Sequence, residues 1–188
     1  MNMKKILFGL MLVAGANTLT PAAAQSQKTV MVGGEAMYTT KDIVDNAVNS
    51  KDHTTLVAAV KAAGLVETLK GKGPFTVFAP TNDAFENLPA GTVETLLKPE
   101  NKATLTSVLT YHVVPGRLDA AKLMSAIKAG KGKATLKTVS GGTLVAMMNG
   151  DRNILLQDEK GNKANISVYD VQQSNGVIHV LDSVLLPN

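Results

Sequence analysis

The chain of 188 residues is 45% hydrophobic and 18% charged, a composition typical of a folded globular protein and not of a disordered one. A formal net charge of only +4 and an aromatic content of 4% argue against a nucleic-acid-binding protein and against sugar binding on aromatic platforms. The sequence contains no cysteine, so no disulfide framework stabilises it and a hydrophobic core must do so.

The N-terminus has the order of residues typical of a secretory signal peptide. Two lysines precede an apolar run of about 11 residues, which is too short to span a bilayer, and small residues follow at Ala22 and Ala24. We therefore expect residues 1–24 to be a signal peptide, cleaved near Ala24 and Gln25. The mature protein would be secreted or periplasmic, with no transmembrane segment.

The rest of the chain divides into an arm and one domain. Residues 25–40 are polar, contain glycine and show little periodicity, which predicts a flexible N-terminal arm. Residues 41–188 have the length of a single domain with one core.

The first half of this domain has the apolar spacing of helices. In "TTKDIVDNAVNS" we expect Thr40 to cap a helix, and in "HTTLVAAVKAAG" Leu56 and Val60 share one face before a stop at Gly64. His53 stands at the start of the second helix, where we expect it to be exposed.

The stretch "TVFAPTNDAF" at 76–85 contains a polar group between two apolar runs. Its first part has the residues of a strand, and Pro80 ends the strand because proline cannot donate to the ladder. Thr81, Asn82 or Asp83 can each cap the helix that follows. We therefore interpret the stretch as a strand-to-helix joint and not as a catalytic site.

Later segments change from helical to strand periodicity. "GTVETLLKPE" and "ENKATLTSVLTYHVV" predict two helices separated at Pro99, and "LDAAKLMSAIKAG" predicts a third that stops at Gly130. Five short β-rich runs with glycine and asparagine turns follow and predict a set of hairpins. Helices followed by antiparallel strands indicate an α+β domain built around a sheet or sandwich.

No pattern in the sequence predicts catalysis, a metal or a cofactor. The three histidines, His53, His112 and His179, lack metal-ligand spacing, and His112 and His179 have the apolar neighbours of core histidines. Ser140 lies in a hairpin turn without the motif of a nucleophile elbow. The glycine and lysine segments lack the spacing of a phosphate-binding loop.

The densest basic run allows two interpretations. It is either a solvated helix end and loop or a patch for anionic glycans or lipid head groups, which salt-dependent binding would reveal. Its members are Lys122, Lys128, Lys131, Lys133 and Lys137.

Three segments together carry a family resemblance: "TVFAPTNDAF", "LTYHVVPGRL" at 109–118 and "SNGVIHVLDSVLLP" at 174–187. In this order and spacing they resemble the first box, the Tyr-His motif and the second box of the fasciclin (FAS1) domain. The resemblance covers about residues 40–187. The box residues are Thr76, Phe78, Pro80, Thr81, Asn82, Phe85, Asn175, Gly176 and His179.

The resemblance implies the FAS1 fold, an antiparallel β-wedge or sandwich of about seven strands covered by several short helices. It also implies a non-catalytic adhesion or interaction module whose partner is an extracellular or envelope protein or a glycan. The chain has no Arg-Gly-Asp sequence, so the integrin partners of animal relatives are not expected here.

Adhesion in the family is attributed to the Tyr-His region and to an Asp-Ile motif before the second box, which here reads Asp-Val. We expect the Asp-Val pair to lie in a loop beside the Tyr-His edge. The resemblance therefore implies binding roles for Leu109, Tyr111, His112, Val113, Val114, Asp170 and Val171.

His112 has two interpretations, a structural one and a direct contact with a partner. A buried histidine at a helix end needs a hydrogen-bond partner, so we favour a structural role in which His112 ties the two boxes together.

A carrier of an apolar, carotenoid-like small molecule is the alternative function, since some secreted single-domain members of the family bind carotenoids. Met147, Met148, Leu155 and Leu156 could line such a site, although methionines on strands more often fill the core.

Overall fold

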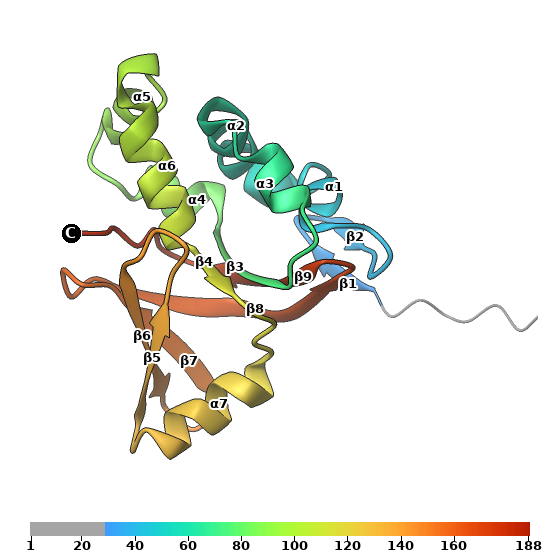
Figure 1. Ribbon diagram of the computed structural model, residues 1–188, viewed down its shortest axis with the longest axis vertical. Coiled ribbons are helices and arrows are strands. Elements are labelled where there is room, and N and C mark those ends of the chain that lie inside the picture. The colour runs from blue at the N-terminus through green and yellow to red at the C-terminus, as the bar shows by residue number, and fades with distance from the viewer. Residues whose placement is uncertain (1–28) are drawn as a thin grey trace, which may run out of the picture.

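The computed structural model describes residues 29–188, and the predicted signal peptide and the first residues of the predicted arm lie outside this range. The described part is an α+β domain with several helices and a seven-stranded, mostly antiparallel sheet, as predicted (Figure 1). The strands are β1 (Val30–Val32), β2 (Glu35–Met37), β3 (Phe75–Pro80), β4 (Val113–Pro115), β5 (Lys133–Lys137), β6 (Thr143–Asn149), β7 (Asn153–Gln157), β8 (Lys163–Gln173) and β9 (Gly176–Leu181).

Most of the helices are short and precede the main run of strands. The α-helices are α1 (Ile43–Ala47), α2 (Thr54–Ala63), α3 (Val66–Lys70), α4 (Asn82–Glu86), α5 (Thr92–Leu96), α6 (Lys102–Tyr111) and α7 (Ala120–Ala129), with 3₁₀ turns η1 (Lys51–His53) and η2 (Pro99–Asn101). None of the helices in residues 29–188 has the length and apolar character needed to cross a membrane.

The seven-stranded sheet has the order β4-β3-β9-β8-β7-β6-β5. Strands β3 and β9 pair in parallel, and all other neighbouring strands of this sheet are antiparallel. Gly176 lies directly against β3, because a Cβ atom there would be 2.2 Å from the carbonyl oxygen of Phe75. The first and second boxes, which are far apart in sequence, therefore lie side by side.

Strand β8 joins two parts of the sheet. Its first half pairs with β7 and its second half with β9, and the register shifts between Ile166, Val168 and Val171. Asp170, at this irregularity, has a φ of +56°. The long strand therefore bends, as bulged strands do.

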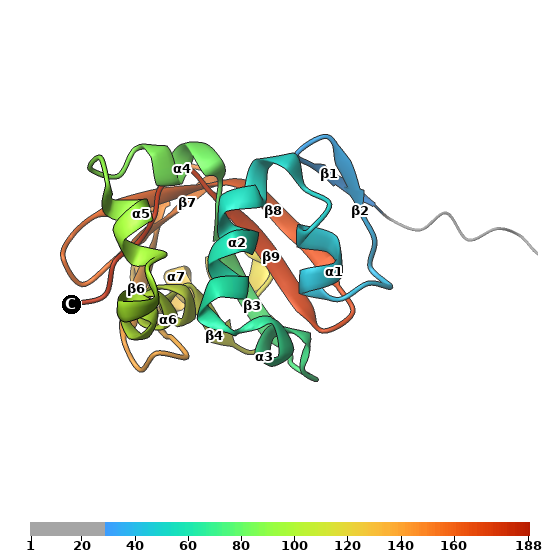
Figure 2. The ribbon, with the colours of Figure 1, turned by 90° about the horizontal axis from the view of Figure 1, so that it is seen from above.

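Two hydrophobic clusters form the core. One lies between helices α1–α6 and the part of the sheet that contains strands β3 and β9. These helices cover that face of the sheet (Figure 2). The other lies between α7 and strands β5–β8, where Leu123 and Ile127 of α7 meet Leu144 and Leu156. Phe78, on β3, belongs to this second cluster.

The N-terminal arm differs from its prediction. Within residues 29–40, β1 and β2 form an antiparallel hairpin, and Val32 and Met37 are buried in the first cluster. The side chain of Asn46 bonds to both main-chain groups of Tyr38 and so anchors the hairpin. Each strand has only three residues, too few to show a clear alternation in the sequence.

The helix boundaries follow the predicted signals with two exceptions. Gly64 ends α2 in the left-handed conformation, and Gly130 follows α7. Thr40 does not cap α1, because the Asp42 carboxylate accepts from the amide of Asp45 in that position. Helix α3 was not predicted, since it is a single short turn directly after α2.

Candidate functional site

The residues of the Tyr-His motif lie inside the domain. Leu109, Tyr111, His112, Val113 and Val114 are all buried, at the end of α6 and in the adjoining strand β4. Their side chains are therefore not presented on the outer surface. Any partner that touches them must reach them through an opening in the domain.

His112 connects three segments. Its ring Nε2 accepts a hydrogen bond from the amide of Leu185 at 3.1 Å, so the hydrogen must be on Nδ1, which donates to the carbonyl of Val108 at 2.8 Å. Its main-chain carbonyl accepts from the amide of Phe78 in the first box at 2.9 Å. Burial lowers the pKa of His112 to about 4, so the ring is neutral at pH 7. The ring therefore holds the second box, while the contact with the first box is made by the main chain of His112.

Tyr111 contacts the turn between β5 and β6 and the turn between β7 and β8. Its hydroxyl donates to the carbonyl of Thr143 at 2.7 Å and accepts from the amide of Glu159 at 3.2 Å. Its ring packs on Gly142, where a Cβ atom would lie only 2.6 Å from ring atom Cε2. Burial raises the pKa of Tyr111 to about 12, so its hydroxyl stays protonated.

Asp170 lies within strand β8 and not in a loop, which corrects the expected loop, and neighbouring Val171 is buried. The Asp170 carboxylate accepts from the amide of Ala120 at the start of α7, at 2.7 Å. The main-chain amide of Asp170 donates to Nδ1 of His179 at 3.3 Å, and Nε2 of His179 donates to the carbonyl of Leu118 at 2.8 Å. Asp170 therefore orients α7 against the sheet.

The other box residues also make structural contacts. Thr76 is buried, and its hydroxyl donates to the carbonyl of Gly116 and accepts from the amide of Leu118. Phe78 stacks on the His179 ring, with centroids 5.6 Å apart. Pro80 is the last residue of β3, and Phe85 is buried on α4.

Two asparagines link separate segments. Asn82 follows Thr81, which caps α4, but the Asn82 side chain accepts from the amide of Thr55 at 3.0 Å and so caps α2 instead. The Asn175 side chain accepts from the amide of Ile43 and donates to the carbonyls of Leu69 and Gly71. The stretch at 76–85 is a strand-to-helix joint, as predicted, and its Asn82 also anchors helix α2.

His53 is buried, which corrects the prediction that it is exposed. The hairpin of β1 and β2 accounts for this difference, because Val32 and Met37 lie beside His53 in a small hollow. Its Nδ1 is 2.8 Å from the Ser50 hydroxyl, and burial lowers its pKa.

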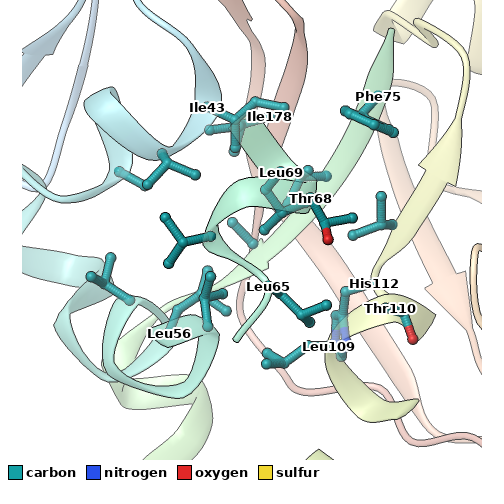
Figure 3. A pocket seen from close by; sticks show the side chains of 18 of the residues that line it. Ile43, Leu56, Leu65, Thr68, Leu69, Phe75, Leu109, Thr110, His112 and Ile178 are labelled. Carbon is teal, nitrogen blue, oxygen red and sulfur yellow. The ribbon is translucent and has the colours of Figure 1, made fainter. Parts of the chain in front are cut away.

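An apolar groove lies between helices α1–α3 on one side and the end of α6 on the other (Figure 3). The space between its lining atoms is about 840 Å³ including open solvent, but the centre of a water-sized sphere can occupy only about 70 Å³ of it, so the groove is narrow. Its floor is formed by residues of β3, β4 and β9, among them Val77, Val113 and Ile178. Leu56, Leu65 and Leu69 line it from the α2–α3 side, and Leu65 lies beside Leu109.

The groove reaches the Tyr-His motif from inside. Leu109, His112 and Val113 are among its lining residues, and Thr110 and the exposed Val139 lie at its edge. The polar atoms of His112 are occupied by backbone partners, so the lining offers almost only apolar contacts. An apolar side chain or a small apolar molecule matches this chemistry.

Local sequence patterns predict only some of the residues that line this groove. Leu56 and Val60 were assigned to the apolar face of a helix, and Val57 beside them widens that face. Val139 gave no signal, because a single valine before a turn is common. The groove depends on how α2, α3 and α6 are spaced, which no local pattern specifies.

The strand residues proposed for an apolar ligand do not line this groove, which corrects that expectation. Leu156 is buried beneath α7 in the second cluster, and Met147 pairs with Leu155 on the opposite face of the same strands. Within residues 29–188, no group of three histidine, aspartate or glutamate side chains could hold a metal ion.

Comparisons with known proteins agree with the fold and the boxes. A family model described as the Fasciclin domain matches residues 51–187. Protein sll1483 of Synechocystis sp. is 48% identical over 163 residues, which cover 86% of this chain and 82% of that protein. Immunogenic protein MPB70 of Mycobacterium bovis is 35% identical over 181 residues, which cover 93% of this chain and 78% of the relative.

Two further matches are to longer proteins. Transforming growth factor-beta-induced protein ig-h3 of Sus scrofa is 33% identical over 150 residues, which cover 77% of this chain but 19% of that protein. The solved structure of a FAS1 domain pair from the insect cell adhesion molecule Fasciclin I matches with a TM-score of 0.69 and 18% identity, covering 78% of this chain and 51% of the pair. At this identity the likeness shows the fold alone.

Proposed function

The chain belongs to the fasciclin domain family, and from this premise we propose that it is a non-catalytic binding module of the adhesion type. Its partner is a protein of the cell surface or extracellular matrix. The name of one match supports this class, since MPB83 of Mycobacterium bovis is a cell surface glycolipoprotein. The signal-peptide pattern supports action outside the cytoplasm.

The apolar groove is the observation that carries this proposal. It is an apolar hollow open to solvent, and residues of the Tyr-His motif line it. His112 and His179 use both ring nitrogens in hydrogen bonds to the backbone, which leaves neither free for proton transfer. We infer that apolar side chains of the partner enter the groove and reach the motif there.

Carriage of a small apolar molecule is the second candidate. The same groove favours it, because its lining is almost wholly apolar. The two candidates differ in what fills the groove when the protein is isolated.

The deciding experiment is native mass spectrometry, with an absorption spectrum, of the protein purified from its own host. A bound small-molecule mass or visible absorbance would replace the adhesion proposal with the carrier. A mass equal to that of the polypeptide, followed by crosslinking to a surface protein through the groove, would support the adhesion module.

A charge at the groove edge should weaken binding in either case. Val139 and Val48 have similar exposed fractions, 45% and 46%, but only Val139 lines the groove. We expect Val139→Asp to weaken binding of the captured partner or ligand at least about tenfold, because a carboxylate would lose solvation in an apolar site. Val48→Asp is the matched control and should bind like the wild type; equal losses in both variants would place the binding site elsewhere.

A further inference from the structure

Strands β5 to β8 have one face that no other part of residues 29–188 buries. Alternate residues of these strands point into the second cluster beneath α7, and the residues between them point outward. We call this outward side the open sheet face. Its members are Lys133, Thr135, Lys137, Thr143, Val145, Met147, Asn149, Asn153, Leu155, Gln157, Lys163, Asn165 and Ser167.

The charges on the open sheet face have a single sign. Lys133, Lys137 and Lys163 are exposed, and no aspartate or glutamate belongs to the face. None of the three ammonium groups lies within 4.0 Å of a carboxylate of residues 29–188. The carboxylates of Glu159 and Asp182 border the face, and each is already bonded to a main-chain amide of it.

The surrounding segment adds to this positive field. Residues 117–163 contain nine basic residues (lysine or arginine) and four acidic ones (aspartate or glutamate). The remaining residues from 29 onward contain seven basic and eleven acidic residues. The lobe formed by α7 and β5–β7 is therefore basic and the rest of the domain is acidic. Such an asymmetry orients a molecule toward an anionic surface.

The spacing of the lysines favours an extended anionic ligand over one small anion. Lys133 and Lys137 are four residues apart on β5, so their Cα atoms are about 13 Å apart, and Lys163 lies three strands away, at about 14 Å. Strand side chains stand roughly perpendicular to the sheet, so extended lysine side chains keep the three ammonium groups too far apart for one phosphate or sulfate to contact all of them at once. An extended chain with repeated negative charges can contact all three.

The remaining side chains of the face distinguish between kinds of polyanion. Seven of them carry a hydroxyl or amide group, which can bond to the hydroxyls of a sugar chain. None is aromatic, so bases of a nucleic acid would find no stacking surface. Val145, Met147 and Leu155 are half-buried at the centre of the face and do not protrude as a membrane anchor would.

From these observations we propose that the open sheet face binds an acidic polysaccharide, a glycan chain bearing carboxylate or sulfate groups. The site is separate from the apolar groove, which lies on the helical side of the domain. The basic run singled out in the sequence is accordingly divided: Lys122 and Lys128 lie on α7, while Lys133 and Lys137 point to the opposite side of the sheet.

The test measures binding of the full mature protein to heparin, with uncharged dextran as the negative control. We expect heparin binding that weakens as ionic strength rises and no binding to dextran. Replacing Lys133, Lys137 and Lys163 together by alanine should weaken heparin binding roughly tenfold. The corresponding arginine variant should retain it.

A second triple variant with the same loss of charge is the matched control. Lys51, Lys98 and Lys102 are exposed and lie outside the open sheet face, so their replacement by alanine should change heparin binding less than about twofold. Equal losses in the two triple variants would overturn the proposal, as would absence of heparin binding at low ionic strength. Tighter binding to phosphatidylglycerol vesicles than to heparin would overturn it in favour of a membrane surface.

Discussion

The histidines of this protein show how burial turns a reactive residue into a structural one. His112 and His179 each place one ring nitrogen as a donor and the other as an acceptor for main-chain groups of distant segments. Burial lowers the pKa of both, so that the neutral form needed for this pairing persists at pH 7. A residue with these constraints is well suited to holding segments together.

His112→Ala should therefore destabilise the domain clearly. The change leaves the buried amide of Leu185 without an acceptor and opens a cavity where the buried ring was, which together should lower the free energy of unfolding by about 2–4 kcal/mol. Thermal unfolding followed by circular dichroism measures the effect. An unchanged melting temperature combined with lost binding would show instead that His112 contacts the partner.

At the scale of elements, short segments are held by side chains from elsewhere in the chain. Asn82 caps α2 from the start of α4, and Asp170 bonds to the start of α7 from β8. Helices of five to ten residues are marginal by themselves, so these contacts stabilise them where local sequence does not. The same holds for the β1–β2 hairpin, which depends on packing against the core.

Two methionines of the hairpin region test whether it belongs to the core. Met37 is 3% exposed and Met31 is 61% exposed. Met37→Ala should lower the free energy of unfolding by about 2–4 kcal/mol because it leaves a cavity in the first cluster, whereas Met31→Ala should change it by less than about 0.5 kcal/mol. Denaturant unfolding of both variants gives the comparison; equal, small effects would mean that the hairpin does not contribute to the cooperative unit.

At the scale of the whole molecule, binding chemistry is divided between two sides. The apolar groove lies beside α1–α3 and α6, in the part of the domain with an excess of acidic residues, and the open sheet face lies on the basic lobe. A surface glycan could therefore hold the protein by one side while the groove on the other side remains available. This arrangement follows from the two hydrophobic clusters of the domain, one beneath α1–α6 and one beneath α7.

The buried histidines also predict how stability depends on pH. In the unfolded chain a histidine has a pKa of about 6.5, whereas burial lowers the pKa of His112 to about 4 and lowers those of His53 and His179. Between these values the unfolded chain binds protons that the folded protein excludes. The stabilisation is therefore complete above about pH 6.5 and is lost as the pH falls toward 4.

Urea unfolding at neutral and mildly acidic pH measures this loss. For His112 alone the decrease should be on the order of 3 kcal/mol, and His112→Asn should flatten the slope between pH 6.5 and 4. A free energy of unfolding that stays constant between pH 7 and 5 would contradict the burial of neutral histidines.

The sequence by itself determined the elements with strong periodicity and clear ends. The helix that stops at Gly64, the joint at Pro80 and Thr81, and the five strands after Gly130 follow from local chemistry, and with the three boxes they indicate the fold. Local signals sufficed because helix ends and turns are decided by neighbouring residues.

Only the tertiary structure decided the environment of the motif residues. Packing of α6 and β4 into the core buries His112 and the Tyr-His motif, the hairpin buries His53, and Asn82 caps a helix other than its own. The groove and the open sheet face likewise depend on which elements cover a surface and which leave it free. Burial and long-range hydrogen bonds join residues far apart in the chain, so no local pattern contains them.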